Sequence, residues 1–351
     1  MKQLATAVAV LAFAACSGAP RHPAERLTVM TRNVYLGADF RAVMAARADS
    51  VPIQAALAWR TLVQTNFPER AGALAREIAE QRPHVVGLQE VVIFRTQDPG
   101  DLAAGGGTPA IAVAYDFLAI ILDSLRAQGA PYAVGVADTT SDVEVPAVSR
   151  AESNGTPHFT DIRFTDRDVI LVRSDVGFST PRGARYAAHI PLKIAGMDLG
   201  LYRGWCSVAI TTAGRTFRFV NTHLEDFSAE VQNAQATELL AVLRGDTLPV
   251  VVVGDLNSDA DTTRTATYGK MTRAGFTDAW KRVRPNDPGY SCCQSELLSD
   301  AKPLFDQRID LVLLKGPLEP VRAELVGSTA TSRTRTGLWP SDHAGLVVGI
   351  R

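Results

Sequence analysis

The chain has 351 residues, of which 46% are hydrophobic and 21% are charged. That apolar content can bury a large core, so the composition argues against disorder and fits one large α/β domain or two smaller ones. The formal net charge is −1, which excludes a broad basic field for holding nucleic acid but leaves room for local basic patches.

The N-terminal segment is typical of an export signal rather than of a folded element. "MKQLATAVAVLAFAAC" has one lysine, an apolar run too short to span a bilayer, and small residues before Cys16. A bacterial lipoprotein signal, with Cys16 as the lipidated first residue, fits the pattern except at Phe13; an ordinary signal peptide cut nearby is the alternative. We expect a signal over 1–15, a tether over 16–26, and location in the cell envelope or outside the cell.

Strands and helices alternate along the rest of the chain, and no break in the alternation calls for a second domain, so we expect a single domain over 27–351. Gly-rich 103–109 lacks the Gly-Lys-Ser/Thr ending of a phosphate-binding loop and is interpreted as a surface loop. The polar stretch 138–166 is predicted to be rich in loops. Helices are predicted over 67–83, with Asn66 as a candidate cap, over 116–129 and over 228–245. Strands are predicted over 27–36, 84–94, 132–137, 167–174, 207–212, 215–225, 248–255, 308–316 and 343–351.

Three cysteines follow Cys16 in the chain, namely Cys206, Cys292 and Cys293. In an oxidising compartment, either Cys206 bridges one member of the adjacent pair, or the adjacent pair forms its own disulfide. A metal site is disfavoured, because neither a second Cys-x-x-Cys nor a nearby histidine cluster accompanies them.

An acidic run, "GDLNSDAD", follows four valines at 250–253. Its alternating oxygen ligands suggest a calcium loop, but such a loop needs a preceding helix, Gly at position six and Glu at position twelve. Here a β-branched strand precedes, and those positions are Ala260 and Ala266. The run is therefore interpreted as the end of a buried strand that presents Asp255 and Asn257, where α/β folds often place functional side chains. Asp259 and Asp261 are expected to cap the turn or helix that follows.

Other polar residues stand at the boundaries of apolar strands. A charge there is costly unless it is paired or binds a cation, and several such positions together indicate a site. The residues are Asn33 in "TRNVYL", Glu90 in "GLQEV", His223 in "VNTHLE", Asp310 in "RIDLVLL", and Asp342 with His343 in "WPSDHAGLVV".

These motifs, in this order, resemble those of the endonuclease/exonuclease/phosphatase superfamily, which includes deoxyribonuclease-I-like nucleases, neutral sphingomyelinases and inositol-polyphosphate phosphatases. The resemblance extends from about Leu27 to Arg351, and "GDLN" with a terminal "SDH" is specific for the superfamily but not for a substrate. It implies a four-layer α/β sandwich, with two packed, mainly antiparallel or mixed sheets flanked by helices. It also implies metal-dependent phosphoester hydrolysis, most readily of a phosphodiester.

The resemblance further implies how the residues share this chemistry. Mg²⁺, with Mn²⁺ or Ca²⁺ as substitutes, would be held mainly by Glu90, with Asn33 nearby and Asp342 binding directly or through water. His343, oriented by Asp310, would be the general base on the attacking water.

On the phosphate itself, Asp255 would position the attacking water, and Asn257 would hold a phosphate oxygen. His223 would bind or protonate the opposite side of the phosphate. Arg203 is a weaker candidate for phosphate binding, because a surface arginine on a strand is equally common.

Several functions remain open within this frame. A nuclease would use basic and aromatic segments such as 280–285 and 333–339, whereas a sphingomyelinase-like enzyme would need exposed apolar loops. A small-molecule phosphomonoesterase and an inactive surface-binding lipoprotein are the alternatives. We expect a monomer that meets the membrane only through an N-terminal lipid anchor.

Overall fold

The computed structural model describes residues 27–151, 153, 155–194, 197–212 and 214–351. The predicted signal, Cys16 and the tether lie outside these described residues. Among the helices that are described, none has the length and apolar character needed to cross a membrane.

The first of two large sheets has eight strands within the described residues, in the order β15-β16-β1-β2-β6-β3-β4, with β5 also paired to β6. The β1 and β2 strands run parallel, and the remaining pairs are antiparallel. The strands are β1 (Leu27–Asn33), β2 (Val85–Gln89), β3 (Ile93–Gln97), β4 (Ala112–Asp116), β5 (Tyr132–Ala151), β6 (Pro157–Arg173), β15 (Pro320–Val326) and β16 (Gly345–Ile350).

The second large sheet has six strands over the same residues, in the order β13-β14-β12-β11-β10-β7, and only β11 and β12 are parallel. A separate hairpin pairs β8 with β9. These strands are β7 (Gly177–Arg185), β8 (Ile190–Ile194), β9 (Met197–Leu201), β10 (Gly204–Thr212), β11 (Arg215–His223), β12 (Val250–Asp255), β13 (Thr277–Asp278) and β14 (Asp310–Lys315).

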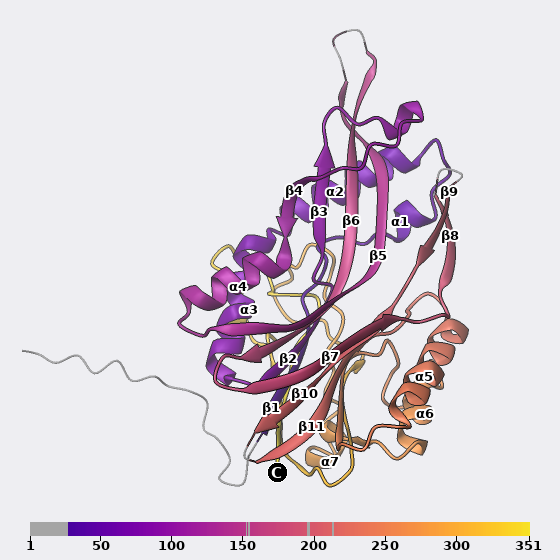
Figure 1. Ribbon diagram of the computed structural model, residues 1–351. Helices are drawn as coiled ribbons and strands as arrows, with labels where there is room; N and C mark the ends of the chain where they lie inside the picture. The colour runs from indigo at the N-terminus through magenta and orange to yellow at the C-terminus, as the bar shows by residue number, and fades with distance from the viewer. Residues whose placement is uncertain (1–26, 152, 154, 195–196, 213) are drawn as a thin grey trace, which may run out of the picture.

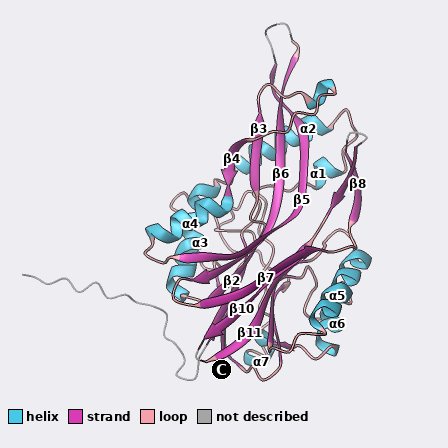
Figure 2. Ribbon diagram, viewed as in Figure 1, coloured by secondary structure: helices cyan, strands magenta, loops and turns pink. Residues whose placement is uncertain are grey.

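Helices cover the outer faces of both sheets, which gives four layers (Figures 1 and 2). Leu74 and Ile121 pack helices against the first sheet, and Leu239 and Met271 pack helices against the second. The four-layer sandwich expected from the resemblance is confirmed. The helices are α1 (Arg41–Met44), α2 (Val51–Gln64), α3 (Phe67–Gln81), α4 (Phe117–Ala127), α5 (Ala229–Leu243), α6 (Thr267–Arg273) and α7 (Ala279–Val283), with short 3₁₀ turns at Leu102–Ala104 and Ala330–Ser332.

The four valines before the acidic run lie in a strand that is buried on both faces. Side chains alternate along a strand, so Val251 and Val253 enter the core between the sheets, whereas Val250 and Val252 face the helices. This explains an unbroken apolar run where a half-exposed strand would alternate with polar residues.

Strand register brings the polar strand ends together. His223 of β11 pairs with Asp255 of β12, and Asp255 pairs with Asp310 of β14. In the first sheet, Asn33 of β1 pairs with Gln89 of β2, which immediately precedes Glu90. Residues that are distant in the sequence are therefore adjacent at the same edge of the fold.

Two sequence expectations about strands are wrong. The segment 138–166 is not rich in loops, because β5 and β6 form a long hairpin there. Its charges are paired across the strands, as Arg163 with Asp142, so polar composition does not prevent pairing. The strand predicted over 84–94 ends at Gln89, because Glu90 takes a left-handed φ of 61° and turns the chain.

The helices predicted from periodicity are confirmed within two residues at each end. Asn66 occupies the N-cap position of α3, as predicted, but its side chain makes no capping hydrogen bond. Asp261 accepts hydrogen bonds from Thr263 in the turn after β12, as expected, and Asp259 is paired instead with Arg264.

Of the two disulfide arrangements considered, the adjacent pair is the one formed: Cys292 is bonded to Cys293. Cys206 is a buried free cysteine of the core between the two sheets.

Candidate active site

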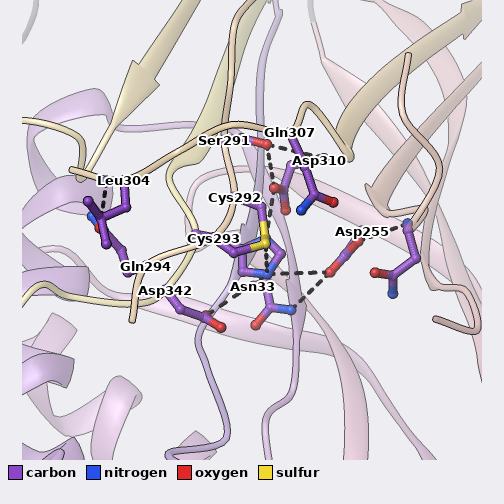
Figure 3. Close-up of a disulfide and its surroundings, with 12 residues drawn as sticks. Asn33, Asp255, Ser291, Cys292, Cys293, Gln294, Leu304, Gln307, Asp310 and Asp342 are labelled. Carbon is purple, nitrogen blue, oxygen red and sulfur yellow. Dashed lines mark hydrogen bonds and ion pairs between the residues drawn. A yellow bond between two sulfur atoms is a disulfide. The ribbon is translucent and has the colours of Figure 1, made fainter. Parts of the chain in front are cut away.

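One pocket of about 630 Å³ collects the candidate residues. Asn33 and Asp310 lie buried behind its wall, with exposed fractions of 0% and 1%. Figure 3 shows Asn33, Asp255, Asp310 and Asp342 converging around the Cys292–Cys293 disulfide. Lining the pocket directly are Glu90, Arg203, His223, Asp255, Asn257, Asp342 and His343. All nine site residues singled out in the sequence are thus gathered at or directly behind one pocket.

Backbone strain marks the edge of the site. Tyr35, Glu90 and Asn257 have φ values of 60°, 61° and 49°. Left-handed conformations are uncommon for residues other than glycine and tend to cluster at functional sites. At each position the chain turns sharply at or just beyond the end of a strand, which leaves a polar side chain at the pocket.

His343 is held by a chain of hydrogen bonds from behind. Its Nδ1 is 2.9 Å from Oδ2 of Asp310, which also accepts a bond of 2.6 Å from the hydroxyl of Ser291. Burial lowers the pKa of His343, but the carboxylates of Asp310, Asp342 and Asp255 raise it more, so the pKa lies well above its ordinary value. The ring is therefore a strong base whose Nε2 faces away from Asp310.

Asp255 lies between the two candidate histidines. Its Oδ2 is 3.6 Å from Nε2 of His223 and 3.7 Å from Nε2 of His343. Burial, opposed by His343, raises the pKa of Asp255 to about 7. The Asp255 carboxylate can therefore contact a water or a phosphoryl oxygen that is also within reach of both imidazoles.

Glu90 and Asp342 are half-buried carboxylates whose charges act on each other. Burial, with the charge of Asp342 next, raises the pKa of Glu90 to about 8, and burial also raises the pKa of Asp342. Asn33 donates from Nδ2 to Glu90 at 2.9 Å and to Asp255 at 3.2 Å. Acidic oxygens that are destabilised together in this way suit a hard divalent cation, which would remove the repulsion.

A second set of ligand atoms lies around His343. Within the described residues, two groups of at least three His, Cys, Asp or Glu ligand atoms lie within 4.8 Å of one another: Asp255 with Asp310 and His343, and Cys292 with Cys293 and His343. The first group confirms that an acidic and histidine cation site can form at this edge, but it does not identify the ion.

His223 lies on the opposite side of Asp255 from His343 and is held by Arg203. Nη1 of Arg203 is 2.9 Å from Nδ1 of His223, and Nη2 is 3.1 Å from Asp226. Burial, then the charge of Arg203, lowers the pKa of His223 well below its ordinary value. Arg203 is buried and lines the pocket, so it is not the surface arginine that was considered as an alternative.

The lining of the pocket as a whole is acidic and apolar rather than basic. Seven carboxylates and three arginines among the described residues line it, and Arg41, Arg203 and Arg264 are each paired with an aspartate. One wall is apolar and comes from the segment after β1 and from the β5–β6 hairpin. Its members are Leu36, Phe40, Val43, Met44, Val143, Val145, Ile162 and Phe164. The basic segments 280–285 and 333–339 contribute no residue to the lining.

Sequence reasoning missed several residues that shape the site. Ser291 supports Asp310, and Asp226 anchors Arg203. Buried Arg70 donates to the carbonyls of Val34, Tyr35 and Pro340, which ties the end of β1 to the loop before Asp342. Asp226 stands three residues after His223, so attention to the residues that follow the His223 motif could have found it. Arg70 sits in an ordinary amphipathic helix, and nothing in the sequence around it indicates a functional role.

Comparison with known proteins gives a family and a fold. The profile of the Endonuclease/Exonuclease/phosphatase family matches residues 57–343. A search of curated proteins finds no match. Similar solved structures include a humanized TDP2 of D. rerio with 14 mutations (17% identity, TM-score 0.52, 93% of this chain and 99% of that chain). Another is an endonuclease/exonuclease/phosphatase family protein from Leptotrichia buccalis (14% identity, TM-score 0.54, 93% of this chain and 99% of that chain). A third is a mannosyl-6-phosphatase from Bacteroides thetaiotaomicron (16% identity, TM-score 0.51, 93% of this chain and 99% of that chain).

Proposed function

The chain belongs to the Endonuclease/Exonuclease/phosphatase family, and from that premise we propose that it is a divalent-metal-dependent phosphodiesterase. One observation carries the proposal: Oδ2 of Asp255 lies 3.6 and 3.7 Å from the Nε2 atoms of two histidines that come from different strands and loops. Two imidazoles facing one carboxylate can serve opposite sides of a single phosphoryl group, as in-line displacement requires.

His343 is the proposed general base. Asp310 accepts the Nδ1 proton, so in the neutral ring Nε2 is free to take a proton from water. Because the surrounding carboxylates favour the charged ring, the neutral form would be favoured by a bound cation that offsets their charge. Asp255, 3.7 Å away, would hold that water by accepting its second hydrogen. Ser291 donates to Asp310 and so keeps its carboxylate turned toward the ring.

Glu90 and Asp342 would hold the cation, with Mg²⁺ as the expected ion and Mn²⁺ or Ca²⁺ as substitutes, and Asn33, which donates to Glu90 from Nδ2, would position that carboxylate. The donor set fits, because half-buried carboxylates with raised pKa values are stabilised by a cation. The ion would supply positive charge for the phosphoryl oxygens and help the leaving oxygen depart. Asn33 already donates to both Glu90 and Asp255, which fixes the spacing between the two halves of the site.

His223 and Asn257 would bind the phosphoryl oxygens on the other side, with Arg203 holding His223 in place. Asn257 is fixed by its bonds to Leu224 and to the carboxylate of Asp255. Amide and imidazole donors preorganised around an anion lower the barrier to phosphoryl transfer.

The pocket favours a small or lipid-type phosphodiester over a long nucleic acid. Its arginines are paired with aspartates, and the basic segments expected to form a nucleic-acid groove do not line it. Nucleic-acid binding depends on several free phosphate contacts. The apolar wall instead suits an apolar group esterified to the phosphate.

The predicted signal supports a further proposal, that this hydrolysis takes place outside the cytoplasm, on a monomer anchored through lipidated Cys16. Mass spectrometry of the mature N-terminus tests it. A diacylated or triacylated Cys16 is expected, and an unmodified start elsewhere would exclude the anchor.

The function is tested by assaying the signal-free protein against a phosphatidylcholine-type diester, an aryl phosphodiester, DNA, RNA and an aryl phosphomonoester. Each substrate is run with Mg²⁺ and with a chelator, and His343→Ala is the inactive control. Turnover of the small or lipid diester that the chelator abolishes is expected. Turnover of the monoester alone would favour a phosphomonoesterase, and activity that survives the chelator would contradict the metal-dependent mechanism.

A further inference from the structure

The Cys292–Cys293 disulfide is part of the wall of the catalytic pocket. Sγ of Cys292 is 3.5 Å from Nε2 of His343, the nitrogen assigned to proton transfer. Both cysteines line the pocket, and Figure 3 shows the disulfide between Asn33, Asp310 and Asp342. Phosphoester hydrolysis as proposed above uses neither sulfur.

The backbone holds Cys292 against His343 regardless of the state of its sulfur. Isolated bridges pair Cys292 with Gln307 on one side and with His343 on the other. The Cys292 carbonyl also accepts bonds from the amides of Asp306 and Gln307, at 2.7 and 3.0 Å. Breaking the disulfide therefore leaves the Cys292 sulfur beside the imidazole.

Cys293 is more accessible and lies between two anchored neighbours. Its side chain is half-buried, whereas that of Cys292 is 2% exposed. The next residue, Gln294, donates its amide to the Asp342 carbonyl at 2.8 Å. A reductant can therefore reach the sulfur of Cys293 through the pocket, and the short tether keeps the released thiol nearby.

From this geometry we propose that reduction of the Cys292–Cys293 disulfide creates a site for a thiophilic cation such as Zn²⁺, formed by both sulfurs and Nε2 of His343. The three ligand atoms lie within 4.8 Å of one another. In a tetrahedral zinc site with ordinary bond lengths, a sulfur and a nitrogen ligand are about 3.5 Å apart. That value matches the separation between Cys292 and His343. Asp255, 3.7 Å from the same nitrogen, can supply a fourth ligand.

The reaction balances with a dithiol as the reductant. The dithiol is oxidised to its own disulfide while the Sγ–Sγ bond breaks, and its two electrons and two protons pass to Cys292 and Cys293 as two thiols. Zn²⁺ then displaces both thiol protons, which leave to solvent, and binds the two thiolates. Soft sulfur ligands favour Zn²⁺ over the oxygen-seeking Mg²⁺, so the two cations have separate preferred sites.

The cation would block hydrolysis, because it binds the Nε2 lone pair that the proposed base uses. This inhibition rests on the proposed function, whereas the site itself does not. Binding is therefore measured separately from turnover.

The test uses the full chain, reduced with a phosphine, freed of reductant and titrated with Co²⁺ without oxygen. One equivalent is expected to produce a near-ultraviolet band from sulfur-to-cobalt charge transfer, which one equivalent of Zn²⁺ removes. The oxidised protein should produce none. A matched cysteine control, Cys206→Ala, removes the buried free thiol and should keep the band.

Three variants decide the ligand set. Cys292→Ser with Cys293→Ser, and the milder Cys293→Ser alone, should lose the band or weaken it strongly, and His343→Ala should weaken cobalt binding about tenfold or more. A band in the oxidised protein, or one that survives both cysteine changes, would overturn the site.

In the assay of hydrolysis, Zn²⁺ should inhibit the reduced protein at lower concentration than the oxidised one. Equal inhibition together with a normal band would overturn only the blocking role, and absent turnover with a normal band would count against the proposed function alone.

Discussion

Arg203 donates from Nη1 to Nδ1 of His223 across 2.9 Å. A guanidinium has no acceptor and stays charged, so Nδ1 must be the unprotonated nitrogen, and the neutral ring carries its proton on Nε2. That nitrogen is 3.6 Å from Oδ2 of Asp255 and 3.2 Å from Nδ2 of Asn257, so two donor groups lie side by side there. His223 is thereby prepared to donate a hydrogen bond to a phosphoryl oxygen while it stays neutral, which favours the binding role considered for it over that of a general acid.

Replacing Arg203 should change the titration of His223 as well as the rate. In Arg203→Met the positive neighbour is lost, so the pKa of His223 should rise from its lowered position, and either tautomer becomes available. We expect kcat to fall about a hundredfold, with a new pH-dependent step. The ring is followed by NMR of labelled histidine, and Arg203→Lys, which keeps a cation, should shift the pKa less. An unchanged His223 titration in Arg203→Met would contradict the pairing.

Asp310 and Ser291 offer a graded test of the support behind His343. Asp310→Asn removes the acceptor for the Nδ1 proton and should lower kcat by about 10³–10⁴, as in other catalytic histidine–aspartate pairs. Ser291→Ala removes the 2.6 Å bond to the Asp310 carboxylate and a longer bond of 3.4 Å from the Asp310 amide, and it should cost far less. Steady-state kinetics, with circular dichroism to verify folding, compare the two variants. Equal losses would mean that the hydroxyl, rather than the carboxylate, orients the ring.

Cation binding should strengthen as pH rises. The pKa of Glu90 is raised to about 8 and that of Asp342 is also raised, so between pH 6 and 8 the cation must displace the proton of Glu90. Each raised carboxyl costs folding stability as pH rises from its unfolded pKa near 4 toward its folded value, the reverse of a salt-bridged acid.

We therefore expect Mg²⁺ to raise Tm more at pH 8 than at pH 6. Calorimetric titration in two buffers of different ionisation enthalpy should detect proton release on binding. Glu90→Gln, which keeps the shape of the side chain, should lose most of both effects. An Mg²⁺-induced shift of equal size at the two pH values would contradict the assignment of Glu90.

Patterns of buried strands were sufficient to predict which residues meet at the site. Four of the site residues stand at the end or the start of an apolar strand: Asn33, His223, Asp255 and Asp310. Because α/β folds place functional side chains at one edge of the sheet, such positions are expected to lie close together. The register that sets Asp255 between His223 and Asp310 depends on long-range pairing, which local patterns do not specify.

Two other features of the site could not be predicted from local sequence patterns, for physical reasons. The apolar wall of the pocket was missed because the β5–β6 hairpin is polar on its other face, and its charges are satisfied only by partners across the strands, such as Arg163 with Asp142. The link between Arg203 and His223 was missed because a guanidinium's partner depends on tertiary geometry. In both cases the polar residue looks surface-like until the partner is known.

Asp168 of β6 is a buried carboxyl group whose replacement by a neutral amide should stabilise the protein. The side chain is fully buried, and neither oxygen accepts a hydrogen bond from the described residues. Burial, then the charge of Asp166, raises its pKa well above the ordinary value. The unfolded chain ionises near pH 4, so the folded state should lose stability as pH rises from there toward the raised pKa.

Asp168→Asn keeps the size of the side chain and removes the charge, so it should raise the free energy of unfolding at pH 8 by about 1–3 kcal/mol and have little effect at pH 4. Urea unfolding at both pH values measures the difference. Asp261→Asn is the matched control, because its exposed carboxylate accepts bonds from Thr263 and its pKa is lowered. That change should destabilise slightly at pH 8. If Asp168→Asn instead destabilises at pH 8 while the control behaves as expected, the buried carboxylate must be ionised and held by a cation or another charge.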